Sequence, residues 1–199
     1  MVIFLAVTVT AIHAQIKPGY IIGVNLSSMT LKTKDLSLNP ETLSGIHFGG
    51  VFQIPLNNIF SLQPGLLLSA KGSNYKIDTA DISISPIYFE IPVMAICSFG
   101  SDAIKISLFA GPYLACGIGG YKIISGGEMT NINFGSGEND DLRHFDAGIN
   151  FGAGVNIKGL MISAQYGIGL ANIAPVSAID SEMRNKVIGI SFSSLFSNK

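Results

Sequence analysis

One stretch of this sequence alternates strictly between apolar and small or polar residues, and this alternation constrains the fold more than any other feature. In HFDAGINFGAGVNIKGLMISAQYGIGL (residues 144–170), every second residue is apolar, and only the Lys-Gly pair at 158–159 interrupts the pattern. Successive residues of a β-strand point to opposite faces, so a period of two predicts strands with one apolar face. The Lys-Gly break predicts a tight turn between two antiparallel strands.

The same period of two recurs along the rest of the chain. It predicts eight strands, at about 18–28, 43–55, 58–71, 82–98, 103–118, 143–158, 160–172 and 186–196. Tight turns alternate strictly with longer polar connections; the turns are at 55–58, 100–103 and 158–159, and the long connections at 29–42, 72–81, 119–142 and 173–185. This arrangement predicts an up-and-down antiparallel meander with all its tight turns at one end. The strands are about twice as long as the 5–6 residues of an average strand, or longer.

Two architectures fit such strands: a soluble barrel with its apolar face inward, and a transmembrane barrel with that face toward lipid. Only 13% of the residues are charged and 48% are hydrophobic, whereas about 25% charged is typical of soluble domains. The charged residues inside strands, Glu90, Lys105 and Asp146, share the face opposite the apolar one. We therefore predict an all-β fold, an eight-stranded antiparallel up-and-down transmembrane β-barrel with a narrow polar interior.

Aromatic residues with the parity of the apolar face gather near the predicted tight turns. They are Tyr20, Phe52, Phe60, Phe99 and Phe196. Aromatic side chains are enriched where a membrane meets water, and the short turns of outer-membrane barrels face the periplasm. We therefore predict that these five residues form a periplasmic aromatic girdle.

Four motifs resemble those of a known family and occur in the family's order. They are FSLQPGLLLSAKGSNY (60–75), YFEIPVMA (88–95), FAGPYLACGIGG (109–120) and YGIGLANI (166–173). Through them, nearly all of the chain after residue 14 resembles the PorT-like family of outer-membrane β-barrel proteins, with Ile168 where the family pattern has leucine. The resemblance implies a barrel in the outer membrane of a Gram-negative bacterium. The family name links it to a protein-secretion apparatus, a role that a shared fold alone does not establish.

The first residues resemble an export signal. VIFLAVTVTAIHA (2–14) is an apolar run that ends in small residues, although no Lys or Arg precedes it. We expect residues 1–14 to be a signal peptide and residues 15–199 to form one outer-membrane β-barrel domain. Export permits disulfides, but Cys97 and Cys116 fall at opposite ends of one predicted hairpin, so we expect no bond between them.

No motif in the sequence indicates catalysis, and we expect no catalytic residue, no cofactor and no metal ligand. His47 and His144 are the only histidines after the signal segment. A nucleophilic triad needs a serine and an acid beside one of them, and no sequence motif places such a pair there. We interpret His47 as a hydrogen-bonded residue of the barrel interior.

Glu90 is the most informative charged residue of the predicted interior. A buried carboxylate needs hydrogen bonds or a cation to stay ionised. If the strands 58–71 and 82–98 pair about a loop centred near 76–77, Glu90 lies opposite Gln63. We therefore hypothesise an interior polar network of Glu90 and Gln63 with Lys105 or Lys71. Its simplest role is to fill the barrel and set its register, and the alternative is a path for protons or solutes.

The composition also limits the partners. A net charge of −1 gives no electrostatic basis for binding nucleic acid. We expect a non-enzymatic protein that contacts outer-membrane lipid, binds a protein partner chiefly through loop 119–142, and serves envelope structure or secretion. A soluble periplasmic lipocalin-like barrel that binds a small hydrophobic ligand is the alternative, and it predicts an apolar interior. A membrane enzyme acting on lipids is a third, and it predicts a reactive cluster at the barrel rim.

Overall fold

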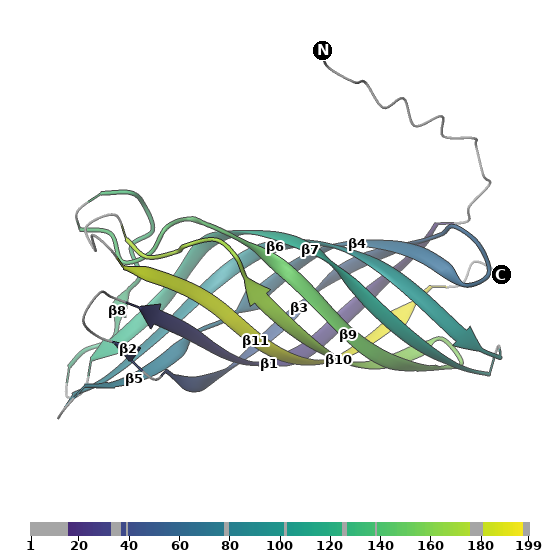
Figure 1. The fold of residues 1–199 in the computed structure, drawn as a ribbon, viewed down its shortest axis with the longest axis horizontal. Helices are drawn as coiled ribbons and strands as arrows, with labels where there is room; N and C mark the ends of the chain where they lie inside the picture. The colour runs from purple at the N-terminus through teal and green to yellow at the C-terminus, as the bar shows by residue number, and fades with distance from the viewer. Residues whose placement is uncertain are drawn as a thin grey trace, which may run out of the picture.

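Eight long antiparallel strands close on themselves in the computed structural model (Figure 1). The structure describes residues 16–32, 37–38, 40–77, 80–101, 103–124, 127–137, 139–175 and 181–196, so the expected signal peptide (1–14) lies outside the described residues. The long strands are β1 (Lys17–Lys32), β3 (Glu41–Pro55), β4 (Phe60–Ala70), β6 (Ala80–Gly100), β7 (Ile104–Ile124), β9 (Phe145–Ile157), β10 (Leu160–Gly169) and β11 (Glu182–Leu195). Three short strands are added at one end: β2 (Ser37–Leu38), β5 (Ser73–Ile77) and β8 (Thr130–Asn131).

Each long strand pairs with its neighbours in chain order, and β1 pairs with both β3 and β11. This closure confirms the predicted eight-stranded up-and-down barrel. The described chain begins and ends at the same end of the barrel, where the Phe196 amide donates a hydrogen bond of 2.7 Å to the Pro18 carbonyl (Figure 1). Among the described residues, no helix is long and apolar enough to cross a membrane.

Apolar side chains cover the outside of the barrel. Residues of the predicted apolar face, such as Ile22, Ile106 and Leu114, are 55%, 57% and 65% exposed. This confirms that the apolar face points outward. An exposed surface of this kind suits contact with lipid and not with water.

The five aromatic residues of the predicted girdle are also exposed. They lie near the tight turns or the strand ends of the same end of the barrel, and the rings of Tyr20 and Phe196 are 5.9 Å apart. Their role at a membrane interface stays a prediction. Cys97 and Cys116 are free thiols, as expected.

The wall of the barrel continues beyond the predicted strands at the long-loop end. The segment 72–81, expected to be a loop, forms most of a hairpin in which β5 pairs with the start of β6. The segment 119–124, also expected to be loop, continues β7 and pairs with β6. Both expectations were wrong because the hydrogen-bonded ladder of the wall continues past the segments in which residue types alternate.

The largest apolar core lies across the long-loop end of the barrel. Its buried side chains are Met29, Tyr75, Ile132, Leu142, Ile173, Ala174 and Met183. We call this cluster the apolar cap. The loop residues Ile132 and Leu142 supply two of its members, and Phe134 and Leu142 form an isolated β-bridge. The apolar cap therefore closes the barrel at the end that faces away from the tight turns.

Candidate functional site

The interior of the barrel is built in layers along its axis. An open vestibule of about 800 Å³ occupies the tight-turn end. Above it comes a belt of apolar side chains, then a layer of buried polar and charged side chains, and finally the apolar cap. The buried polar layer is the strongest candidate site, because ionisable side chains are rarely buried unless they are paired, and such buried groups cluster at functional sites.

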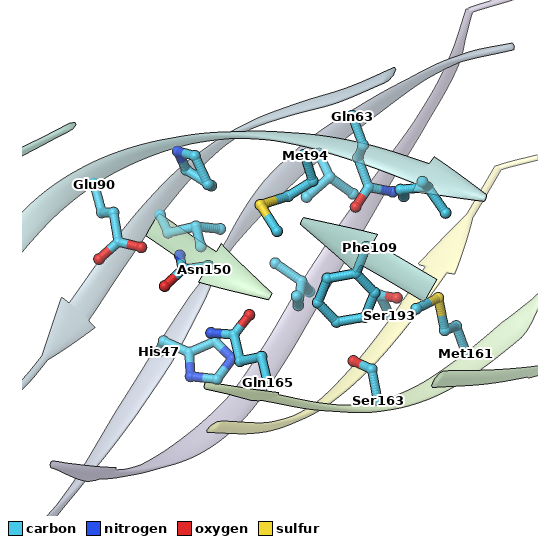
Figure 2. Close-up of a pocket in the computed structure, with 15 residues that line it drawn as sticks. His47, Gln63, Glu90, Met94, Phe109, Asn150, Met161, Ser163, Gln165 and Ser193 are labelled. Carbon is cyan, nitrogen blue, oxygen red and sulfur yellow. The ribbon is translucent and has the colours of Figure 1, made fainter. Parts of the chain in front are cut away.

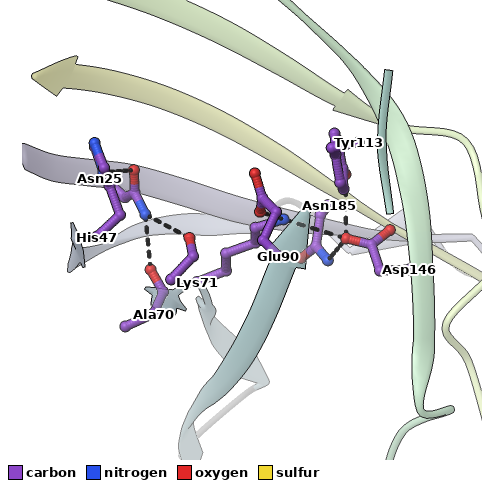
Figure 3. Close-up of polar contacts among 9 residues, drawn as sticks. Asn25, His47, Ala70, Lys71, Glu90, Tyr113, Asp146 and Asn185 are labelled. Carbon is purple, nitrogen blue, oxygen red and sulfur yellow. Dashed lines mark hydrogen bonds and ion pairs between the residues drawn. The ribbon is translucent and has the colours of Figure 1, made fainter. Parts of the chain in front are cut away.

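Lys71 is the cation of this layer (Figure 3). It follows β4 directly and is 4% exposed, with its Nζ 2.8 Å from Glu90 Oε2 and 3.3 Å from Asp146 Oδ2. The same Nζ lies 4.2 Å from the centre of the Tyr113 ring. The ammonium group thus has two carboxylates and an aromatic face as partners, which offset the cost of removing it from water.

Asp146 contacts three other members of the cluster through one carboxylate oxygen. Its Oδ2 accepts hydrogen bonds from the Tyr113 hydroxyl (3.1 Å) and from the Asn185 side-chain amide (2.9 Å), in addition to the contact with Lys71. These residues come from β6, β7, β9, β11 and the end of β4, so the cluster joins both halves of the barrel. Among the described atoms, Asp146 Oδ1 and Asn185 Oδ1 have no hydrogen-bond partner, so one oxygen on each side chain is left for water or for rearrangement.

A second group of hydrogen bonds surrounds His47 in the same layer. The Asn25 side-chain amide donates to the Ala70 carbonyl (3.0 Å) and to Ser69 Oγ (3.1 Å), which turns Asn25 Oδ1 toward His47 Nδ1 at 2.8 Å. Because an amide oxygen only accepts, Nδ1 carries the hydrogen. In the neutral ring, Nε2 therefore accepts the hydroxyl hydrogen of Ser191, 2.8 Å away. The surrounding hydrogen bonds thus select one tautomer of His47.

Ser191, His47 and Asn25 are connected in the order found in a hydrolase triad. Their side chains are deeply buried, since the three residues are 1%, 2% and 1% exposed. A hydroxyl without access to substrate is not a usable nucleophile, and an amide in the third position cannot balance an imidazolium charge as a carboxylate does. Both features argue against a nucleophilic role, and the hydrogen bonds agree with the interpretation of His47 as a hydrogen-bonded interior residue.

The apolar belt separates this layer from the vestibule. Figure 2 shows Glu90 and Gln63 on opposite sides of a cavity, with Met94 between them. The cavity has a volume of about 40 Å³, enough for one or two water molecules. Its walls include inward-facing apolar side chains that the predicted polar interior did not anticipate: Val51, Leu67, Met94, Ile96 and Phe109.

The hypothesised network is only partly assembled. Glu90 lies opposite Leu67, and Gln63 lies opposite Met94, so the expected pairing of Glu90 with Gln63 is wrong. The reason is the extended β5–β6 hairpin, in which Ile77 pairs with Ala80. The two strands thus pair about the midpoint between Ile77 and Ala80, two positions further along the chain than expected.

Lys105 belongs to a different layer from Glu90. The β7 residue opposite Glu90 is Ala115, ten positions from Lys105, and strands rise about 3.3 Å per residue. Lys105 lines the vestibule at the tight-turn end. Of the two cations that the sequence offered, Lys71 and not Lys105 is the one beside Glu90.

Five participants were not assigned to a network from the sequence: Asn25, Ser69, Tyr113, Asn185 and Ser191. Each has the inward parity of its strand, which was the only available signal, but inward parity does not tell which residues meet across the barrel. Within the described part of the chain, no group of three or more His, Cys, Asp or Glu side chains could hold a metal ion.

One protein family matches most of the chain. Residues 13–174 match the family described as outer membrane protein beta-barrel domain. The chain belongs to this family. The protein therefore resides in the outer membrane of Gram-negative bacteria, where its tight turns face the periplasm and its long loops face outward. The lipocalin-like alternative is not favoured, because the apolar face is outside and the interior holds ionised groups. No curated protein sequence matches the chain.

Several solved structures of small outer-membrane proteins align with this family member. The attachment invasion locus protein Ail of Yersinia pestis, solved with the heparin analogue sucrose octasulfate, shares 12% identity with a TM-score of 0.41, covering 89% of this chain and 98% of Ail. Neisserial surface protein A shares 12% identity with a TM-score of 0.44, covering 89% and 97%. The outer membrane enzyme PagL shares 11% identity with a TM-score of 0.44, covering 86% and 99%. These values are too low to carry an argument about function.

Proposed function

We propose that this outer-membrane barrel is neither an enzyme nor a channel, and that its outward-facing end is a preorganised binding surface for a protein partner. The role would lie in envelope structure or in secretion, in line with the resemblance to the PorT-like family. The observation that carries the proposal is the apolar cap, in which described residues of the long loops pack together at the end of a filled barrel.

Hydrogen bonds hold the loops of the cap to one another. Arg143 Nε donates to the Ala174 carbonyl at 2.9 Å. Asn172 Oδ1 accepts from the backbone amides of Ala174 (3.0 Å) and Met183 (2.9 Å). Loops that are already ordered lose little conformational entropy on binding, so a partner gains affinity.

The outer face of the cap supplies the contact surface. Met129 is 64% exposed, and Thr130 and Asn131 beside it are also exposed. They belong to the loop region 119–142 that we expected to contact a partner. A photo-crosslinking residue at Met129 is expected to give a discrete adduct in intact cells. The same residue at Asn57, an exposed position at the opposite end, is the matched control. Identical adduct patterns from both positions would argue against an outward-facing partner.

The filled interior supports the absence of a pore. Between the vestibule and the apolar cap, the described side chains enclose cavities of only about 40 Å³ and 10 Å³. Eight strands leave an interior just wide enough for side chains. In planar lipid bilayers the purified barrel is expected to produce no stable conductance steps, and steps of the size seen for porins would overturn this part of the proposal.

A further inference from the structure

The vestibule at the tight-turn end is not part of the proposed binding surface. Its volume of about 800 Å³ lies within the range of about 300–1,000 Å³ typical of ligand sites. It is open at the periplasmic rim, where the turns β3–β4, β6–β7 and β9–β10 contribute to its lining.

The vestibule is blind. Gln63, Ile96, Met161 and Ser193 line both the vestibule and the small cavity above it, and therefore form its floor. Phe109 lines the small cavity just behind this floor. A ligand can thus enter only from the periplasmic side.

The charged residues that the structure describes in this lining are all basic. Lys17, Lys105 and Lys158 line the vestibule, and none of its described lining residues is acidic. The described carboxylates lie in mid-barrel or toward the long loops: Glu41, Asp81, Glu90, Glu128, Asp140, Asp141, Asp146 and Glu182. Asp102, in the β6–β7 turn, lies outside the described residues. Clustered charge of one sign in a concave site with low-dielectric walls attracts ligands of the opposite sign.

The lysines face the barrel interior and not the lipid. Lys17 and Lys105 have the inward parity of β1 and β7, and both line the vestibule. Lys17 lies opposite Gln53 on β3, and Lys105 lies opposite Asn156 on β9. Each ammonium therefore has an amide side chain as its cross-strand neighbour. This placement favours a ligand inside the vestibule over a phospholipid headgroup outside it.

The walls carry amide and hydroxyl groups that hydrogen-bond to one another, and each group has more donors or acceptors than these bonds use. Gln53 Nε2 donates to Ser61 Oγ at 2.8 Å, and the hydroxyl groups of Ser98 and Ser107 are 2.8 Å apart. Amides and hydroxyls can donate to and accept from peptide groups, while the lysines bind carboxylates. The volume exceeds what a small inorganic anion requires.

From these observations we infer that the vestibule binds an acidic peptide segment of a periplasmic protein. The lysines bind its side-chain carboxylates, and the polar walls bind its backbone. This inference concerns the periplasmic end of the molecule and does not depend on the binding surface proposed for the loops.

The test is binding of a rhodamine-labelled hexaglutamate peptide to the barrel in phosphatidylcholine nanodiscs, followed by fluorescence anisotropy. We expect saturable binding that weakens between about 50 mM and 300 mM salt. The triple variant Lys17→Gln, Lys105→Gln, Lys158→Gln is expected to lose affinity by about tenfold or more. The matched control is Lys32→Gln, Lys76→Gln, Lys186→Gln, which removes the same charge at the long-loop end and should leave the affinity unchanged.

Three results would overturn the inference: no saturable binding, an equal loss in both triple variants, or binding to the wild type that does not depend on salt. A fourth result would overturn it by pointing to a different ligand. If phosphatidylglycerol in the nanodisc displaces the peptide from the wild type, lipid headgroups and not a peptide occupy the lysines. Gel migration without boiling establishes that each variant is folded, and the salt dependence of the wild type tests the inference even if one variant does not fold.

Discussion

Replacing Lys71 with methionine is the sharpest test of the interior charge cluster. The side chains of Lys71, Glu90 and Asp146 are 4%, 6% and 0% exposed, so water screens none of them effectively. Methionine keeps much of the length of lysine and removes its charge. Lys71→Met therefore leaves two buried carboxylates without their cation.

The size of the effect follows from this burial. Removing one partner of a buried ion pair costs roughly 3–5 kcal/mol, because the remaining charge is uncompensated. Since about 1.4 kcal/mol corresponds to a tenfold change, the folding equilibrium constant should fall by roughly a hundredfold to several-thousandfold. The triple variant Lys71→Met, Glu90→Gln, Asp146→Asn removes all three charges together and should recover much of this loss.

Urea unfolding in detergent micelles, read from the gel mobility of unboiled samples, measures the change. Lys76→Met is the matched control, because Lys76 forms an exposed ion pair with Glu41 at 2.8 Å. That pair raises the pKa of Lys76 through a hydrogen bond and through charge, yet exposed pairs contribute little. The control should leave the unfolding midpoint unchanged. If Lys71→Met behaves like the control, the reasoning about buried charge is wrong.

Three further predictions concern the cap and the histidine. Gly117→Val should loosen the cap and speed limited proteolysis of its loops, because a Cβ at this position would lie 2.1 Å from the Phe134 ring. Ser191→Ala should destabilise the barrel by about 1–3 kcal/mol in urea unfolding, since it leaves His47 Nε2 buried without its hydrogen bond, and it should not change any lipid hydrolysis in the preparation. Burial raises the pKa of Tyr75 to about 12 from the usual 10. A raised pKa means that the stabilisation is complete below pH 10 and is lost as the pH rises through 12, by up to about 3 kcal/mol. Tyr75→Phe should remove the Tyr75 contribution, so that thermal unfolding shows a smaller loss of stability between pH 10 and 12 than in the wild type.

Each of these has a result that would count against it. Unchanged proteolysis of Gly117→Val would mean that Phe134 moves aside without cost. A loss of lipid hydrolysis in Ser191→Ala would revive the hydrolase interpretation. An alkaline loss of stability as large in Tyr75→Phe as in the wild type would assign that loss to other groups.

Much of the fold followed from the sequence because lipid and the barrel interior impose opposite demands on alternate residues. The strands that contain Ile22, Ile106 and Leu114 are identified by this alternation alone, and all three side chains point outward. In β5 and in the last residues of β7, the residue types do not alternate in this way. The sequence then reads as loop although the hydrogen-bond ladder continues.

The register between β4 and β6 shows what alternation cannot decide. The predicted partner of Glu90, Gln63, is four positions from the observed one, Leu67. A shift by an even number of residues keeps every side chain on its face, so both registers satisfy the same pattern. The position of the β5–β6 turn selects one of them, and it was not evident in the residues alone.

The sequence by itself determined where the molecule resides: eight long strands, an apolar outside and a polar inside follow from the residue types at alternate positions. Only the tertiary structure decided which inward residues meet. Lys71 forms ion pairs with Glu90 and Asp146, and Ile132 joins the same apolar cluster as Met29, because closure of the barrel brings distant strands and loops together. Whether a side chain points inward or outward is a local property of its strand. Which side chains meet across the barrel depends on register and closure, which involve the whole chain.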